Sequence, residues 1–70
     1  MDAGGYYTKY QAIAFITMQT RFGRRIIENM MEKLETAGEI TFTKGLDNKS
    51  LLISSGDVQK VIDALRQYPA

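Results

Sequence analysis

The apolar residues between Arg24 and Ala37 recur with helical spacing, and the pattern changes to strand alternation directly after Gly38. The helical stripe consists of apolar side chains that are adjacent or lie three or four positions apart: Ile26, Ile27, Met30, Met31 and Leu34. Such a stripe predicts an amphipathic helix with one buried face, and Gly38 suits the left-handed position beyond its end. Residues 40–43 then alternate apolar and polar side chains, as in a half-buried strand. A helix joined directly to a strand in so short a chain predicts an α+β fold.

The chain has 70 residues, which is enough for one domain with one hydrophobic core. It contains neither cysteine nor histidine. Disulfides and thiolate zinc sites are therefore excluded, and the side chain that most often serves as a general base or metal ligand is missing. The carboxylates are scattered, and no phosphate-binding glycine loop is visible. We expect a single domain over residues 1–70 that is not an enzyme, holds no metal or cofactor and has no small-molecule substrate.

The longest uncharged stretch, Tyr10 to Thr20, is too short and too polar to span a bilayer. The chain begins with Met1-Asp2-Ala3-Gly4-Gly5, which is acidic where a secretory signal carries basic residues. We therefore expect a cytoplasmic protein with no membrane partner.

The first part of the chain predicts an arm, a helix and a turn. Adjacent glycines make residues 1–7 a flexible arm. Thr8 and Gln11 have the spacing of a capping box, which predicts a helix from Lys9 to about Met18. Many of its side chains are apolar, so we expect most of its surface, Met18 included, to be buried. Residues 20–23 predict a turn in which Gly23 permits a positive φ, although a single kinked helix fits the same residues.

The second half of the chain predicts a hairpin and a last helix. Strands over 40–43 and Ser50–Ser54 flank a loop of about five residues, as in an antiparallel hairpin. Ser54 or Ser55 caps the helix that follows. Its apolar side chains have the spacing of one helical face: Val58, Val61, Ile62 and Leu65. Pro69 lies beyond its end.

The segment from about Ile13 to Ile53 resembles the winged helix-turn-helix family. Leu34-Glu35-Thr36-Ala37-Gly38-Glu39-Ile40 is similar to the signature that ends the second helix of that motif and enters the wing. The sequence departs from the family at Thr17 and Arg21, where alanine and glycine are usual, and the family's first helix is missing. The resemblance implies a winged-helix-like domain: a helix-turn-helix, a two-stranded wing and a C-terminal helix. Either that last helix or a second copy of the chain must supply the missing cover, so we expect a homodimer.

What the resemblance implies is binding of double-stranded DNA, with the helix from about Arg24 to Ala37 in the major groove and the 44–49 wing on the backbone. The candidate DNA-binding side chains are basic or carry an amide: Arg21, Arg24, Arg25, Asn29, Lys44 and Lys49. The net charge is only +1, but it is unevenly distributed. Residues 1–27 carry four basic side chains against Asp2, whereas residues 28–39 carry Lys33 against four glutamates. We expect a small dimeric regulator of transcription, or one of plasmid or phage type.

These features also have simpler interpretations. The two arginines of the second helix lie just before Glu28, where they can form ordinary exposed helix pairs. The two hairpin lysines can protect a strand edge. Ile26 and Met30 occupy positions where the family usually has polar side chains, which favours an interface. The alternative is therefore a protein–protein interaction module of winged-helix shape, or a phage-type inhibitor of a host protein, that does not bind DNA.

Overall fold

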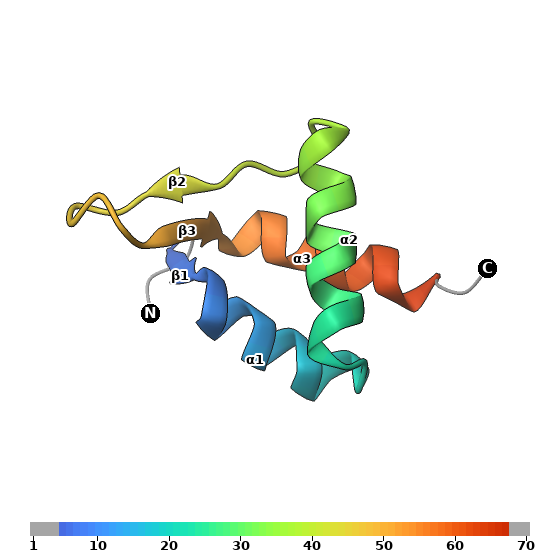
Figure 1. The fold of residues 1–70 in the computed structure, drawn as a ribbon. Coiled ribbons are helices and arrows are strands. Elements are labelled where there is room, and N and C mark those ends of the chain that lie inside the picture. The colour runs from blue at the N-terminus through green and yellow to red at the C-terminus, as the bar shows by residue number, and fades with distance from the viewer. Residues whose placement is uncertain (1–4, 68–70) are drawn as a thin grey trace.

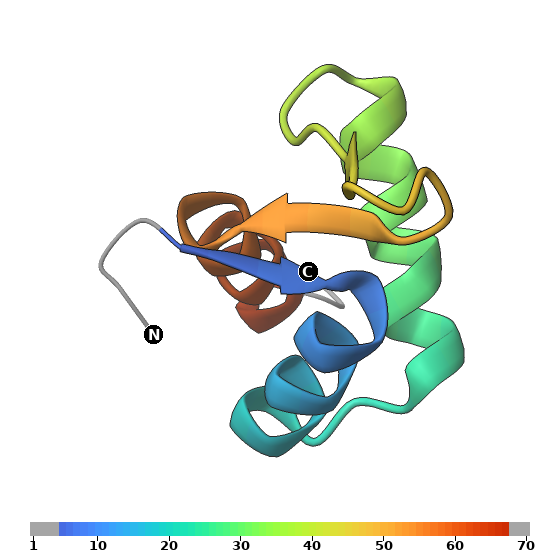
Figure 2. The ribbon, with the colours of Figure 1, turned by 90° about the vertical axis from the view of Figure 1, so that its left-hand side faces the viewer.

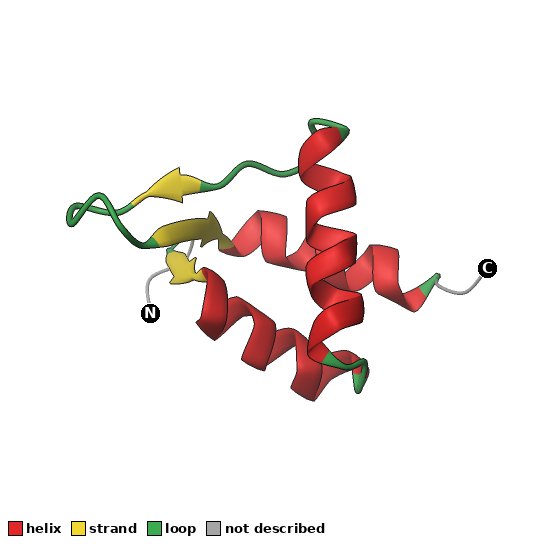
Figure 3. Cartoon of the chain, in the orientation of Figure 1, coloured by secondary structure: helices red, strands yellow, loops and turns green. Residues whose placement is uncertain are grey.

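The computed structural model describes residues 5–67 as three helices around one core, with a small sheet toward one end (Figures 1 and 3). In chain order the elements are β1 (Tyr6–Thr8), α1 (Lys9–Thr20), α2 (Arg24–Thr36), β2 (Thr43–Lys44), β3 (Leu51–Ser54) and α3 (Ser55–Arg66). This order confirms the predicted α+β class and the predicted sequence of two helices, a hairpin and a last helix. Within residues 5–67, no helix is both long and apolar enough to cross a membrane.

β3 is the central strand of the sheet, with β1 on one edge and β2 on the other (Figure 2). Both pairings are antiparallel, and Tyr7 lies opposite Ile53. The prediction of a flexible arm over 1–7 is therefore wrong at Tyr6 and Tyr7. The backbone N–H and C=O groups on both edges of a strand need hydrogen-bond partners. β2 pairs with one edge of β3, and β1 pairs with the other edge, which β2 leaves open. Met1 to Gly4 lie outside the described residues.

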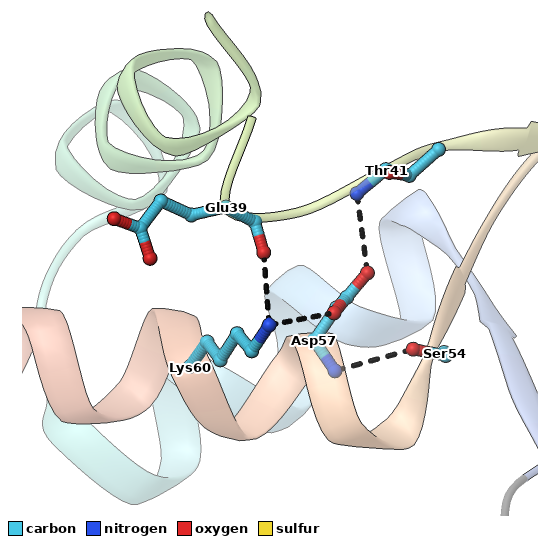
Figure 4. Close-up of polar contacts among 5 residues, drawn as sticks. All are labelled: Glu39, Thr41, Ser54, Asp57 and Lys60. Atoms are coloured by element: carbon cyan, nitrogen blue, oxygen red, sulfur yellow. Dashed lines mark hydrogen bonds and ion pairs between the residues drawn. The ribbon is translucent and has the colours of Figure 1, made fainter. Parts of the chain in front are cut away.

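The first strand of the hairpin is shorter than predicted. β2 pairs with β3 only from Thr43 onward, three residues later than expected. The segment before it is held by α3 instead (Figure 4). The Thr41 amide donates to Asp57 Oδ2 at 3.1 Å, and Lys60 Nζ donates to the Glu39 carbonyl at 3.1 Å. These bonds to α3 side chains take the place of ladder bonds, so the strand begins late.

The ends of the helices confirm the predicted caps. At the start of α1, the backbone N–H of Gln11 donates to Thr8 Oγ1 at 3.1 Å, and the backbone N–H of Thr8 donates to the side-chain Oε1 of Gln11 at 3.0 Å. Together these two bonds form a complete capping box. At α3 the Asp57 amide donates to Ser54 Oγ at 3.2 Å, so Ser54 is the cap. Gly38 follows α2 with a φ of 79°, as its position predicted.

α1 and α2 are separate helices joined by a short turn, which excludes the single kinked helix. The left-handed residue of this turn is Arg21, with a φ of 64°, and the prediction of a positive φ at Gly23 is wrong. The Arg21 amide donates to the Thr17 carbonyl at 2.8 Å and closes the end of α1, where a left-handed residue is common. Gly23 precedes α2 as its N-cap, a position that requires extended backbone.

The core combines apolar side chains from all three helices, β3 and the segment before β2. Its buried members are Ala12, Ile13, Ile16, Ile27, Met31, Ile40, Ile53, Val58, Val61, Ile62 and Leu65. α3 packs against both α1 and α2. α3, the C-terminal helix, thus covers the pair formed by α1 and α2. It is one of the two sources of cover that the sequence left open.

α1 is less enclosed than expected. Met18, predicted to lie in the core, is 78% exposed, and Phe15 and Tyr10 are also exposed. The reason is that the buried positions of α1, Ala12, Ile13 and Ile16, share one side of the helix, on which both α2 and α3 pack. The opposite side of α1 keeps its apolar side chains at the surface.

Replacing Ile27 by alanine tests the packing of α2, because this side chain is 0% exposed. We expect the free energy of unfolding to fall by about 2–5 kcal/mol, through lost burial and the cavity left behind. Urea unfolding followed by circular dichroism measures the loss. The control is Leu46→Ala, at a fully exposed leucine in the hairpin loop, which should change stability by less than about 0.5 kcal/mol. Equal stability of the two variants would contradict this packing.

Candidate nucleic-acid interface

All six side chains predicted to bind DNA lie on the surface. Arg21 follows α1 as its C-cap. Arg24 and Arg25 begin α2, and Asn29 lies one turn further along that helix. The other two flank the loop of the hairpin: Lys44 ends β2, and Lys49 lies shortly before β3. The question is then which of these groups the fold brings together.

Basic side chains from three separate elements meet around Tyr10, in the first turn of α1. The Arg24 guanidinium lies over the Tyr10 ring, 5.4 Å from its centroid. Tyr10 also lines a shallow hollow together with Lys9 and Lys49. Tyr10 thus contacts Arg24 at the start of α2 and shares one hollow with Lys49 of the hairpin loop. We call Lys9, Arg24 and Lys49 the basic cluster.

Lys9 and Tyr10 were not among the predicted site residues, although the capping box already placed both at the start of a helix. What brings them to the hairpin is the pairing of β1 with β3, because β1 ends directly before α1. A three-residue strand after adjacent glycines gave no recognisable signal in the sequence. Lys9 also approaches the segment before β2, since its Nζ lies 5.8 Å from the centroid of the Phe42 ring.

An acidic flank lies beside the basic cluster. Three glutamates on the side of α2 that faces Lys9 and Phe42 line a common hollow: Glu28, Glu32 and Glu35. These carboxylates repel phosphates, and they follow the arginines along α2. An attractive surface for a polyanion is therefore confined to the first part of α2, the start of α1 and the hairpin loop.

The arginines at the start of α2 differ in their contacts. Arg24 Nε donates to Glu28 Oε2 at 3.1 Å, and the Arg24 side chain remains 63% exposed. An exposed helix pair of this kind contributes only about 0.3–0.5 kcal/mol, so a phosphate can replace the carboxylate at little cost. Within residues 5–67, neither Arg21 nor Arg25 has an ion-pair partner. Their guanidinium groups are free to bind an anion.

The hairpin loop is held in one shape by its own hydrogen bonds. Asp47 Oδ1 accepts from the amides of Lys49 and Ser50, both at 3.0 Å, and its Oδ2 accepts from Ser50 Oγ at 3.0 Å. The Gly45 amide donates to the Ser50 carbonyl at 2.8 Å, and Asn48 adopts a left-handed φ of 61°. The hydrogen bonds from Ser50 and Lys49 to the carboxylate lower the pKa of Asp47 below its ordinary value.

A small hollow of mixed character adjoins the acidic one on α2, because Asn29 lines both. Ile26, Asn29, Met30 and Lys33 line it. Ile26 is exposed, whereas Met30 is half-buried and packs against the core. Within residues 5–67, the glutamates of the acidic flank included, no group of three or more acidic side chains is arranged so that it could hold a metal ion.

Comparisons with family models, with curated proteins and with solved structures find no match to this chain. The function must therefore be inferred from the geometry of the domain.

Acidification tests the role of Asp47 in the loop. Because its pKa is lowered by folding, its contribution to loop stability is complete above the ordinary aspartate pKa of about 3.9 and is lost as the pH falls through the lower folded value. An NMR titration should show the Lys49 and Ser50 amide signals moving with a midpoint below that ordinary value. The Asp47→Ala variant is the control, and its signals should not follow this titration. A midpoint at or above the ordinary value would contradict the hydrogen bonding described here.

Proposed function

We propose that this domain is a winged-helix-like regulator of transcription, or of plasmid or phage type, that binds double-stranded DNA. The start of α2 enters the major groove, and the 44–49 loop of the hairpin lies on the backbone. The observation that carries the proposal is the basic cluster, in which Arg24 and Lys49 are both neighbours of Tyr10. The start of α2 and the hairpin loop, which a duplex would have to contact together, thus both present positive charge near Tyr10.

The exposed stripe of α2 supports a role in base recognition. Ile27 and Met31 are buried beneath the helix, whereas Arg25 and Asn29, four positions apart, are exposed. A major groove of B-DNA admits an α-helix, and arginine and asparagine form bidentate contacts with guanine and adenine respectively. Each such contact contributes about 1–3 kcal/mol of discrimination against the wrong base.

The acidic flank determines which part of α2 can approach a duplex. Glu32 and Glu35 lie in the second half of the helix, close to the segment before β2. Phosphates placed beside Glu32 and Glu35 would be repelled, so the duplex must contact the start of α2, where Arg24 pairs with Glu28, and leave the end of the helix outside the groove. Recognition helices of helix-turn-helix proteins use their N-terminal residues in this way.

A second copy of the chain completes the proposed regulator. The outer side of α1 exposes Phe15 and Met18, and the stretch Tyr10–Thr20 carries no charge. A helix with apolar residues all round its circumference is normally buried. Two copies that meet through Phe15 and Met18 would bury apolar side chains from an uncharged stretch. Paired recognition helices match the half-sites of a palindromic operator.

A second candidate function is supported by the acidic flank and by the hollow at Ile26 and Met30. A surface that is apolar on one side of α2 and acidic on the other suits a protein partner better than a polyanion. On this alternative the domain is a protein–protein interaction module, or a phage-type inhibitor of a host protein, that does not bind DNA. Absence of any salt-sensitive duplex binding would favour it.

The double variant Arg24→Ala/Arg25→Ala tests DNA binding directly. We expect it to lose binding to a fluorescently labelled 30-bp duplex, measured by anisotropy at 50 mM salt, because it removes one member of the basic cluster and one exposed base-reading side chain. Binding by the unaltered protein should weaken steeply between 50 and 200 mM salt, since each neutralised phosphate releases counterions. The thermal transition should stay near its original temperature.

The charge-matched control is Lys33→Ala/Arg66→Ala, which removes two exposed positive charges from the last turns of α2 and α3. Exposed substitutions of this kind change stability little, so duplex binding and the thermal transition should both be kept. Equal loss of binding by the two double variants would show that net charge alone matters. Full binding by Arg24→Ala/Arg25→Ala would remove α2 from the interface.

The variant Met18→Glu tests the proposed dimer. A charge in the middle of an apolar contact must be desolvated on association, so we expect a shift from dimer to monomer in light scattering at concentrations where the unaltered protein is dimeric. Gln67→Glu, which adds the same charge beyond α3, should remain dimeric. Dimers of unchanged stability in Met18→Glu would place the interface elsewhere.

A further inference from the structure

Leu46 lies in the loop between β2 and β3, which projects from the body of the domain (Figure 1). Its exposure is 110% of the reference value, so no described residue covers any of its side chain. Single exposed leucines are common and need no special explanation. The position of Leu46 within an ordered, basic loop is what distinguishes it from an incidental surface residue.

The loop presents Leu46 in a defined position. Asp47, the next residue, accepts three hydrogen bonds from Lys49 and Ser50. The Asn48 amide donates to the Gly45 carbonyl at 3.0 Å, which closes the turn on either side of Leu46. An apolar side chain on a loop that is ordered before binding loses less conformational entropy when it is inserted into a partner.

The residues around Leu46 fit the chemistry of a DNA minor groove. Lys44 and Lys49 flank the loop, and Asn48 lies two positions from Leu46. Proteins that bind the minor groove use lysine, arginine and asparagine side chains there, and they insert apolar wedges, leucine among them, between base pairs. The one carboxylate in the loop, that of Asp47, is engaged with three donors of the loop itself.

We propose that Leu46 is an intercalating wedge: the hairpin loop enters a minor groove, and the leucine side chain inserts between two base pairs and kinks the duplex. This inference rests on the proposed function, since it needs a duplex held by α2 and the basic cluster. The wedge unstacks one base step, and the bend brings more of the backbone within reach of the lysines at the loop. Pyrimidine–purine steps are the easiest to unstack, so the wedge would favour sites with TA or CA steps opposite the loop.

The experiment uses a mixed-sequence 30-bp duplex pool rich in TA steps, with a donor and an acceptor dye at its two ends. A kink shortens the distance between the ends, so the unaltered protein should raise the energy transfer at 50 mM salt. A second pool with 2-aminopurine beside the TA steps should become brighter, because unstacking relieves the quenching of this base. Leu46→Ala should lose both signals and still bind the duplex, as measured by anisotropy.

Two control variants separate the wedge from general apolar contact. Leu46→Met keeps a long apolar side chain and should keep both signals. Tyr6→Ala removes an exposed aromatic side chain from β1, outside the hairpin loop, and should also keep them. Leu46→Ala should unfold at the same temperature as the unaltered protein, which excludes damage to the fold.

The outcomes distinguish this inference from the proposed function. If the unaltered protein binds the duplex without bending it, or if Leu46→Ala bends it equally, the wedge is wrong and DNA binding stands. If the unaltered protein does not bind any duplex at low salt, the proposed function fails and the wedge fails with it.

Discussion

The pairing of β3 on both of its edges is the constraint on which the rest of this domain depends. β2 pairs with one edge to complete the hairpin, and β1 pairs with the other and leads directly into α1. The capping box at Thr8 therefore starts α1 at the side of the hairpin, and Tyr10 lies beside Lys49. Because β1 pairs with β3 and runs directly into α1, it holds the start of α1, and with it Lys9 and Tyr10, beside the hairpin.

α3 has a comparable effect on the helices. By packing on α1 and α2 together, it gives these two helices a common core, and within the described residues no helix precedes α1. It also holds the segment before β2 through hydrogen bonds from Thr41 to Asp57 and from Lys60 to Glu39 (Figure 4). What α3 does not cover is the outer side of α1, where Met18 remains at the surface. The same packing that closes the core leaves an apolar surface open.

The sequence was informative wherever the cause of a structure is local. The capping box at Thr8, the cap at Ser54 and the left-handed Gly38 each depend on residues within a few positions, and all three are confirmed. The buried Ile27 and Met31 follow in the same way from helical periodicity.

The sequence was uninformative where the cause lies far along the chain. β1 forms because β3 has an open edge, and β2 begins late because Asp57 competes for the Thr41 amide; neither cause is visible near the residues affected. Met18 looked like a core residue because apolar composition does not show which side of a helix its neighbours occupy. For the candidate site, all six predicted side chains lie on the surface. Of these six, the structure brings only Arg24 and Lys49 to Tyr10, and the approach of Lys49 depends on the non-local β1 pairing.

The closeness of the basic cluster and the acidic flank has a consequence for any duplex-binding role. Attraction from Arg24 and Lys49 is partly offset by Glu28 and the two glutamates beyond it, and the net charge of the chain is only +1. One copy would therefore hold non-specific DNA weakly at physiological salt, because that mode of binding depends on neutralised phosphates. Affinity would then have to come from base contacts and from joining two copies, since a second linked site raises affinity without any new kind of contact. The DNA binding of such a domain would rise steeply with its own concentration, because two copies have to join. This dependence would be useful in a regulator whose single copy is electrostatically almost neutral.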